Sequence, residues 1–355
     1  MTTAQPSAAH GGTPRGFWRF FRATEVQEVL ALVIMLTLIV VVMASSSNLF
    51  LSQRNIINLL MDSTTVGLIA VFTTMLMISG GLDLSVAATA AMCGVIIGAS
   101  QETMGLWQSV VLALGAGALV GLINGFLVTF VGINPLITTL GMLSIARGLA
   151  FVFADGLTIP VFDLSGEHAQ SYTTFTQLAE GRLLDIPYPI FVMAAFFILG
   201  IVLLRYTTYG RAMYAIGDNE DASFLAGLPV RRYRMIAYML SGLSAAVAAV
   251  FLTSRLYAAD PRAAPNIELT VITAVVLGGT SLAGGQGNLF GTLLGVLILS
   301  SLLNGLKLQS VSTELQNIAQ GFVLLLAVGI DQVRQGKIDL GLWRYFRRQA
   351  GASTQ

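Results

Sequence analysis

Asp83 is the only charged residue between positions 63 and 101 of an otherwise apolar and small-residue stretch. Gly80 and Gly81 precede it, and Ser85 follows it. An acid in such surroundings can cap a helix that begins after a glycine-rich break, because its oxygens accept hydrogen bonds from free backbone N–H groups. It can also contact a solute or an ion directly. Both interpretations stay open, and capping is the favoured one.

The other polar side chains in the apolar stretches are neutral amides and hydroxyls. Such donors and acceptors suit a path for an uncharged, hydroxyl-rich solute. Each of them can equally form a hydrogen bond between two helices, and we expect that simpler role for at least half of them. With Gly80, Gly81, Asp83 and Ser85, the residues predicted to line a translocation path are Asn124, Asn134, Thr138, Asn304 and Gln320.

Several kinds of chemistry have no residues to carry them. The sequence contains no G-x-x-x-x-G-K-[ST] phosphate loop and no H-E-x-x-H metal motif, and its two histidines, His10 and His168, are far apart. No nucleophile is paired with a base. We therefore predict no catalytic residues, no metal and no cofactor bound by this chain, which cannot hydrolyse ATP by itself.

The apolar stretches themselves have the length of membrane-spanning helices. The chain is 55% hydrophobic and 10% charged, whereas a soluble domain is about 25% charged. A bilayer core about 30 Å thick needs about 20 apolar residues in a helix. We predict an all-α polytopic membrane protein with about ten spans. They are placed at 28–46, 63–79, 84–101, 107–129, 135–153, 188–205, 234–253, 267–283, 288–306 and 314–331.

Charge sets the expected orientation and excludes some partners. The net charge of +1, with scattered basic residues, argues against a nucleic-acid partner. Cytoplasmic loops of membrane proteins are enriched in lysine and arginine. This bias places both termini in the cytoplasm, as tails at 1–27 and 333–355 around a permease domain at 28–332. The basic residues left on the other side are Arg54, Arg182, Arg255, Arg262 and Lys307.

The polar loop at 206–233 then faces the cytoplasm. Asp218 or Asn219 can cap a two-turn helix there, acidic residues suit its first turn, and Gly227 can end it. Apolar side chains exposed on a short helix indicate a docking surface, although an amphipathic linker on the lipid surface fits the same composition. The residues assigned to docking are Gly217, Asn219, Glu220, Ala222, Phe224, Leu225 and Gly227.

Two short motifs occur twice. Gly80-Gly81 recurs as Gly278-Gly279, and Asn124-Gly125 recurs as Asn304-Gly305. Two pseudo-repeated halves with glycine-interrupted spans are common among transporters. The spacing between the motifs differs in the two halves, so the relative orientation of the repeats stays open, and chance similarity in glycine-rich spans is an alternative.

Longer runs connect the sequence with a known family. They are SGGLDLSV at 79–86, GINPLITTLG at 132–141 and VLGGTSLAGG at 276–285. Over about 28–332, the chain resembles the permease subunits of monosaccharide ABC importers of the ribose and xylose type. It departs from the family pattern at Ala87, where glycine is usual, and at Asp218, where the family favours a second glycine.

The resemblance implies a type II ABC importer-like fold and a place in the bacterial inner membrane. Two permease subunits, identical or similar, would form one path for a pentose or hexose. Partner ATPases, which carry ATP and Mg²⁺, would dock on the 206–233 loop, and a periplasmic sugar-binding protein would deliver the solute. A nucleoside in place of the sugar is one alternative; another is an ion-coupled secondary carrier that works alone.

Overall fold

The computed structural model describes residues 23–161 and 169–334. These residues are mostly helical, as predicted, and the few strands are two residues long. The predicted tails fall largely on residues 1–22 and 335–355, outside the described residues, so the domain boundaries stay predictions.

Eight helices in the described part of the chain are long and apolar enough to cross a membrane, which confirms a polytopic membrane protein. The third of them continues from α4 into a short π-helix, Leu127–Val131. The eight are α1 (Ala23–Ser46), α2 (Gln53–Ile78), α4 (Leu106–Phe126), α5 (Pro135–Phe153), α7 (Tyr188–Tyr206), α10 (Val230–Leu256), α12 (Leu289–Leu308) and α13 (Thr313–Arg334).

The remaining two predicted spans, 84–101 and 267–283, correspond to α3 (Val86–Met104) and α11 (Ile267–Leu277). Helix α3 ends in a polar turn. Helix α11 has 11 residues, so it is about 16 Å long, which is about half the thickness of a bilayer core. The count of ten spans therefore stays a prediction. Both helices adjoin non-helical segments, the first interruption (79–85, before α3) and the second interruption (278–288, after α11).

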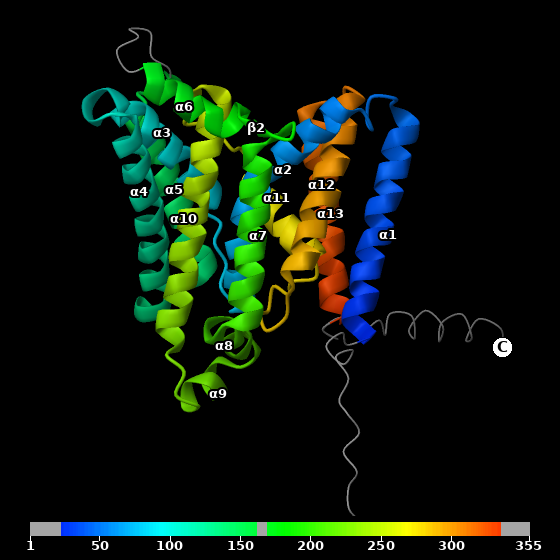
Figure 1. Cartoon of the computed structure of the whole chain (residues 1–355). Coiled ribbons are helices and arrows are strands. Elements are labelled where there is room, and N and C mark those ends of the chain that lie inside the picture. Colours follow the sequence, from blue (N-terminus) through cyan, green and yellow to red (C-terminus); the bar gives the residue numbers. More distant parts are fainter. Residues whose placement is uncertain (1–22, 162–168, 335–355) are drawn as a thin grey trace, which may run out of the picture.

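Short elements cover the two ends of the helix bundle. At one end lie α8 (Thr208–Asp218) and α9 (Glu220–Leu225), and at the other lies α6 (Ala169–Glu180) (Figure 1). We call these the α9 end and the α6 end. Two antiparallel strand pairs complete the fold: β1 (Ile159–Pro160) with β4 (Ala258–Ala259), and β2 (Arg182–Leu183) with β3 (Ile186–Pro187).

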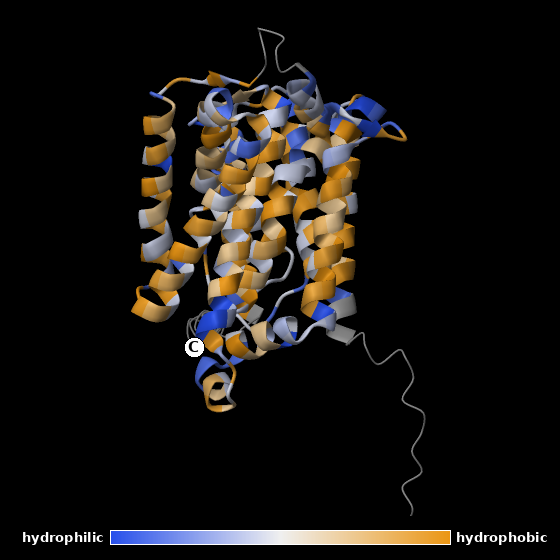
Figure 2. Cartoon of the chain, turned by 60° about the vertical axis from the view of Figure 1, so that its left-hand side comes forward, coloured by the Kyte–Doolittle hydropathy of each residue, from blue (hydrophilic) through white to orange (hydrophobic). Residues whose placement is uncertain are grey.

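The start of α1 and the end of α13 both lie toward the α9 end (Figure 1). Figure 2 shows apolar residues along the helices and hydrophilic residues gathered near the two ends. Basic residues at the α9 end include Arg205 at the close of α7, Arg211 in α8, and Arg231, Arg232 and Arg234 at the start of α10.

Helices α4 and α10 touch through glycines. Gly117 and Gly121, one turn apart on α4, face Gly242 and the backbone of Tyr238 on α10. A Cβ at Gly121 would overlap the carbonyl oxygen of Tyr238. Small residues at this spacing let two helix backbones approach closely, which drives association where lipid removes the hydrophobic effect between helices.

We predict that Gly121→Ala destabilises the protein, because the added methyl group must push α10 away from α4. Overpacking of this kind costs about 1–3 kcal/mol. Thermal unfolding of the detergent-solubilised chain measures the effect. Gly115→Ala is the matched control, since a Cβ at Gly115 of the same helix meets no atom within 4 Å. Equal unfolding temperatures for the two variants would contradict the close-packing interpretation.

Candidate functional site

Most of the first interruption, 79–85, is enclosed by the protein, and Gly80 is its exposed residue. Ser79, Gly81, Asp83 and Ser85 are all buried, and Gly80 has a positive φ of 80° that favours glycine as the chain leaves α2. Non-helical backbone at membrane depth is tolerated only where protein groups or water satisfy its N–H and C=O groups. The side chains that do so define the site.

Asp83 is the centre of a buried hydrogen-bond network. Its Oδ1 accepts from the Ser85 backbone N–H at 2.9 Å and from the Ser85 hydroxyl at 2.6 Å, while its Oδ2 accepts from the Ser241 hydroxyl at 3.1 Å. Asn124 of α4 donates to Ser85 Oγ at 2.9 Å and lies 3.5 Å from Asp83 Oδ1. The carboxylate thus joins the start of α3 to α4 and α10.

Asp83 accepts from the backbone N–H of Ser85 and so holds the turn that leads into α3. The N-cap position of α3 is Ser85 itself, whose side chain forms no capping hydrogen bond, so the capping interpretation of Asp83 stays a prediction. Ser241 lies about 17 Å along α10 from the first residue of that helix. The network therefore sits well within the length of the spans. Contact between Asp83 and a transported solute stays a prediction.

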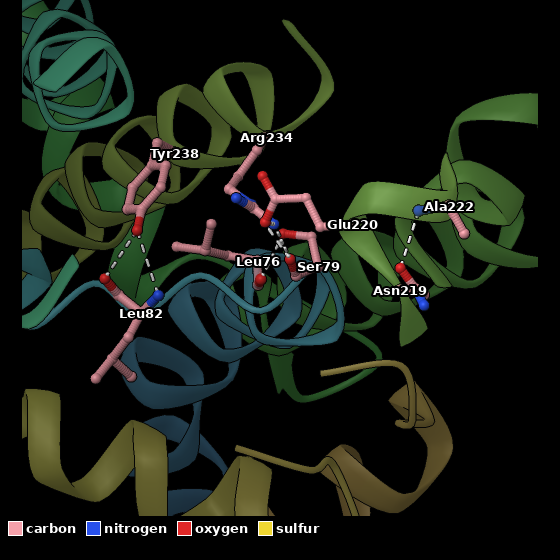
Figure 3. A network of polar contacts seen from close by, with 8 residues as sticks. All are labelled: Leu76, Ser79, Leu82, Asn219, Glu220, Ala222, Arg234 and Tyr238. Atoms are coloured by element: carbon pink, nitrogen blue, oxygen red, sulfur yellow. Dashed lines mark hydrogen bonds and ion pairs between the residues drawn. The ribbon is translucent and has the colours of Figure 1, made fainter. Parts of the chain in front are cut away.

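Two further residues of α10 hold the backbone of the first interruption (Figure 3). The Tyr238 hydroxyl donates to the Leu82 carbonyl oxygen at 3.2 Å and accepts from the Leu82 N–H at 3.3 Å. Arg234 donates to the Ser79 carbonyl oxygen through Nε at 3.2 Å and through Nη2 at 2.9 Å. Arg234, Tyr238 and Ser241 share one face of α10, because their spacing is i, i+4 and i+7.

The second interruption, 278–288, meets the first near the end of α2. The Gly285 N–H donates to the Ile78 carbonyl oxygen at 2.9 Å. Tyr214 of α8 donates from its hydroxyl to the Gly287 carbonyl oxygen at 2.8 Å. Gly217 of α8 packs against Ile78 and Gly285, since a Cβ at position 217 would overlap the Ile78 carbonyl oxygen and the Gly285 nitrogen. Helix α8 therefore rests on the junction of the two interruptions.

Tyr209 attaches the start of α8 to the start of α10. Its ring stacks on Tyr233 with 5.4 Å between ring centroids, and its hydroxyl donates to the Tyr233 carbonyl oxygen at 3.2 Å. Burial, followed by the neighbouring Tyr233, raises the pKa of Tyr209 above its ordinary value. The hydroxyl therefore stays protonated at neutral pH and keeps its role as a donor.

Helix α9 is short but closed at both ends. Of the two predicted caps, Asn219 is the one used: its Oδ1 accepts from the Ala222 N–H at 2.9 Å (Figure 3). Gly227 follows the helix with φ of 85°, and the Leu228 N–H bonds back to the Ser223 carbonyl oxygen, as in a Schellman motif. Phe224 and Leu225 remain 69% and 84% exposed.

The structure does not bring all the predicted path residues together. Gly80, Gly81, Asp83 and Ser85 lie in the first interruption, and Asn124 of α4 bonds to Ser85 there. The others lie elsewhere: Asn134 caps α5 through Leu136 N–H, Thr138 is buried one turn later, Asn304 pairs with Asn55, and Gln320 donates to Thr270 Oγ1.

Sequence reasoning missed the residues of α10 and α8 that hold the interruptions. No sequence pattern assigns a role to Arg234, Tyr238, Ser241 or Tyr214. The repeated spacing of polar residues along α10 could have indicated a polar face. The backbone partner of Arg234 lies 155 positions away in the sequence, and that of Tyr238 lies 156 positions away. No local sequence pattern reveals contacts between residues so far apart.

Comparison with known proteins gives the family context. Residues 55–328 match the family described as branched-chain amino acid transport system / permease component. The ribose import permease protein RbsC of Bacillus subtilis is 40% identical over 299 residues, which cover 84% of this chain and 90% of the relative.

Two other relatives show similar coverage. RbsC of Escherichia coli K12 is 37% identical over 89% of this chain and 97% of its own length. The L-arabinose ABC transporter permease protein AraH of Azospirillum brasilense is 39% identical over 81% and 83%. No solved structure matched the chain. On this match and these identities, the chain belongs to the branched-chain amino acid transport system permease component family.

Proposed function

We propose that this chain is the membrane-spanning permease subunit of an ABC importer that carries a monosaccharide, with a pentose as the first candidate. The relatives named for ribose and L-arabinose import support the substrate class, and their coverage extends over most of the chain. Hydrolysis of ATP would belong to a partner ATPase, which binds the nucleotide and Mg²⁺.

The observation that carries the proposal is the exposed apolar pair on α9. Phe224 and Leu225 project from a capped helix at the end of the bundle where basic residues of α7, α8 and α10 also lie. A solvent-exposed apolar knob on a rigid support fits the pocket of a soluble partner. We assign the ATPase to this knob.

The same assignment orients the chain in the bacterial inner membrane. The α9 end, with the start of α1 and the end of α13, would face the cytoplasm, in keeping with its basic residues. A periplasmic binding protein would then meet the α6 end. A second permease subunit, identical or similar to this one, would complete the translocation path.

We predict that Leu225→Asp abolishes association with the ATPase, because a carboxylate at the docking knob would be desolvated in the partner's pocket. Gly227→Pro should do the same, since proline cannot adopt the positive φ that ends α9. Copurification of the ATPase from membranes measures both effects. Insertion of the variants in the membrane should be unchanged.

Leu184→Asp is the control for this experiment. Leu184 is 86% exposed, much like Leu225, but it lies in the turn between β2 and β3 toward the α6 end. We expect normal ATPase association in this variant. Normal assembly of Leu225→Asp and Gly227→Pro would refute the docking role of α9.

Sidedness is tested with single cysteines. The native Cys93 is buried, so Leu184→Cys and Leu225→Cys each add one accessible thiol. A membrane-impermeant maleimide applied to intact spheroplasts should label position 184 at once and position 225 only after permeabilisation. Labelling of position 225 in intact spheroplasts would overturn the proposed orientation and, with it, the assignment of the ATPase.

Uptake by purified components separates the remaining alternatives. With its ATPase and binding protein in proteoliposomes, the chain should import labelled ribose or arabinose only when ATP is present on the ATPase side. Transport by this chain alone, driven by an ion gradient, would establish the ion-coupled carrier instead. ATP-driven uptake of uridine but of neither pentose would show that the solute is a nucleoside.

A further inference from the structure

We propose that Arg234 is the positioning residue that transmits displacement of α9 to the first interruption, and so to the buried Asp83 network. The inference rests on the proposed function, since it supposes that a partner moves α9. It adds a specific route from the docking helix into the membrane.

Arg234 is the shared partner of both elements (Figure 3). Its Nη2 lies 2.9 Å from Glu220 Oε2, on the first residue of α9, and 2.9 Å from the Ser79 carbonyl oxygen. Its Nε also bonds Ser79, at 3.2 Å. The Arg234 side chain is 13% exposed and that of Glu220 is 55% exposed. The route therefore begins at the surface and leads inward.

Only a guanidinium can make this junction with one side chain. Its planar fork directs several N–H groups at fixed angles, so two of them can share one carbonyl while one also reaches a carboxylate. A lysine ammonium is a point charge on a flexible stem and does not set the direction of Ser79 relative to Glu220. Arg234 thus sets the position of Ser79 relative to Glu220 and also neutralises the Glu220 carboxylate.

The segment that follows Ser79 is held by side chains of α10 and α4. Beyond Ser79, the Leu82 backbone is bonded to Tyr238, and Asp83 is bonded to Ser241 and, through Ser85, to Asn124. Only Gly80 and Gly81 lie between Ser79 and this bonded stretch, so we expect a displacement of Ser79 to reach Leu82, Asp83 and, through Ser85, the start of α3. Helix α9 also moves as a unit, because both of its ends are capped.

A parallel contact ties α8 to the second interruption. Tyr214 bonds the Gly287 carbonyl oxygen, and Gly217 packs on the Ile78 carbonyl and the Gly285 amide. The α8–α9 unit therefore contacts the second interruption directly and reaches the first interruption through Arg234, which is ion-paired with Glu220 of α9. A substitution at Arg234 should therefore weaken the response of the first interruption and leave that of the second interruption unchanged.

Hydrogen–deuterium exchange of the full chain, bound to its ATPase in lipid nanodiscs, tests the route. In the wild type, a non-hydrolysable ATP analogue should change the exchange rates of amides 79–85. In Arg234→Gln we expect that nucleotide-dependent change to shrink about tenfold, within the usual range of coupling between sites, while amides of α9 still respond. Arg234→Lys should not restore it.

The nucleotide-dependent change in exchange is compared between the wild type and the variant. This comparison separates transmission of the α9 displacement by Arg234 from a purely structural role of Arg234. A purely structural Arg234 would alter exchange at 79–85 equally with and without nucleotide, and that result would overturn the proposal. Should Arg234→Gln fail to fold, Glu220→Gln removes only the ion pair, leaves the bonds to Ser79, and should also weaken the nucleotide-dependent change. Arg232→Gln, which removes an exposed arginine of the same helix turn, is the control and should behave as wild type.

The outcomes also distinguish this inference from the proposed function. Failure of the wild-type chain to bind the ATPase would refute the proposed function. Binding of the ATPase with an unchanged nucleotide response in Arg234→Gln, or an equal loss in Arg232→Gln, would refute the route through Arg234 and leave the proposed function standing.

Discussion

The structure depends on satisfying a non-helical backbone within an apolar surrounding. Each peptide N–H and C=O left without a partner in hydrocarbon costs several kcal/mol. The first interruption lacks the regular bonds of a helix: the N–H groups of Ser79, Gly80 and Gly81 still bond to carbonyl oxygens of α2, and the backbone beyond them needs other partners. Helix α10 supplies some of these partners: Arg234 bonds the Ser79 carbonyl and Tyr238 bonds the Leu82 backbone, while Ser241 bonds the Asp83 carboxylate. Together with the bonds to α2, these contacts explain why a helix can break inside the membrane at this point without unfolding the region.

The glycine contact between α4 and α10 makes that remedy possible. Gly121 lies against the backbone of Tyr238, and Asn124, three residues later on α4, reaches Ser85 and Asp83. A larger residue at 121 would move α10 outward and lengthen the hydrogen bonds of Tyr238 and Ser241 together. Close apolar packing and buried polar bonding are therefore coupled on the same pair of helices, so neither can be altered alone.

Much of the architecture could be predicted from charge spacing, because exclusion of charge from hydrocarbon is a local property of sequence. The eight long helices follow from it, whereas the short helix in the 206–233 loop was predicted from its capping residues, its acidic first turn and Gly227. Hydropathy does not reveal where an apolar helix stops, so α11 was expected to continue through residues 278–283. The residues predicted to line the path lie only partly together in the structure. Asn124 and Asn304 share an Asn-Gly motif, yet Asn124 bonds Ser85 and Asn304 bonds Asn55. Contacts across the chain decide such pairings.

A helix of six residues is far too short to be stable alone, and this bears on how α9 can act. The Asn219 cap, the Gly227 turn and the Glu220–Arg234 pair hold it in one conformation before any partner arrives. A partner that binds Phe224 and Leu225 therefore loses little free energy to ordering the helix. The same restraints that preorganise α9 for binding also prevent it from bending when it is displaced. We therefore expect force applied to the exposed pair to reach Glu220, the restraint through which Arg234 joins α9 to the interior of the bundle.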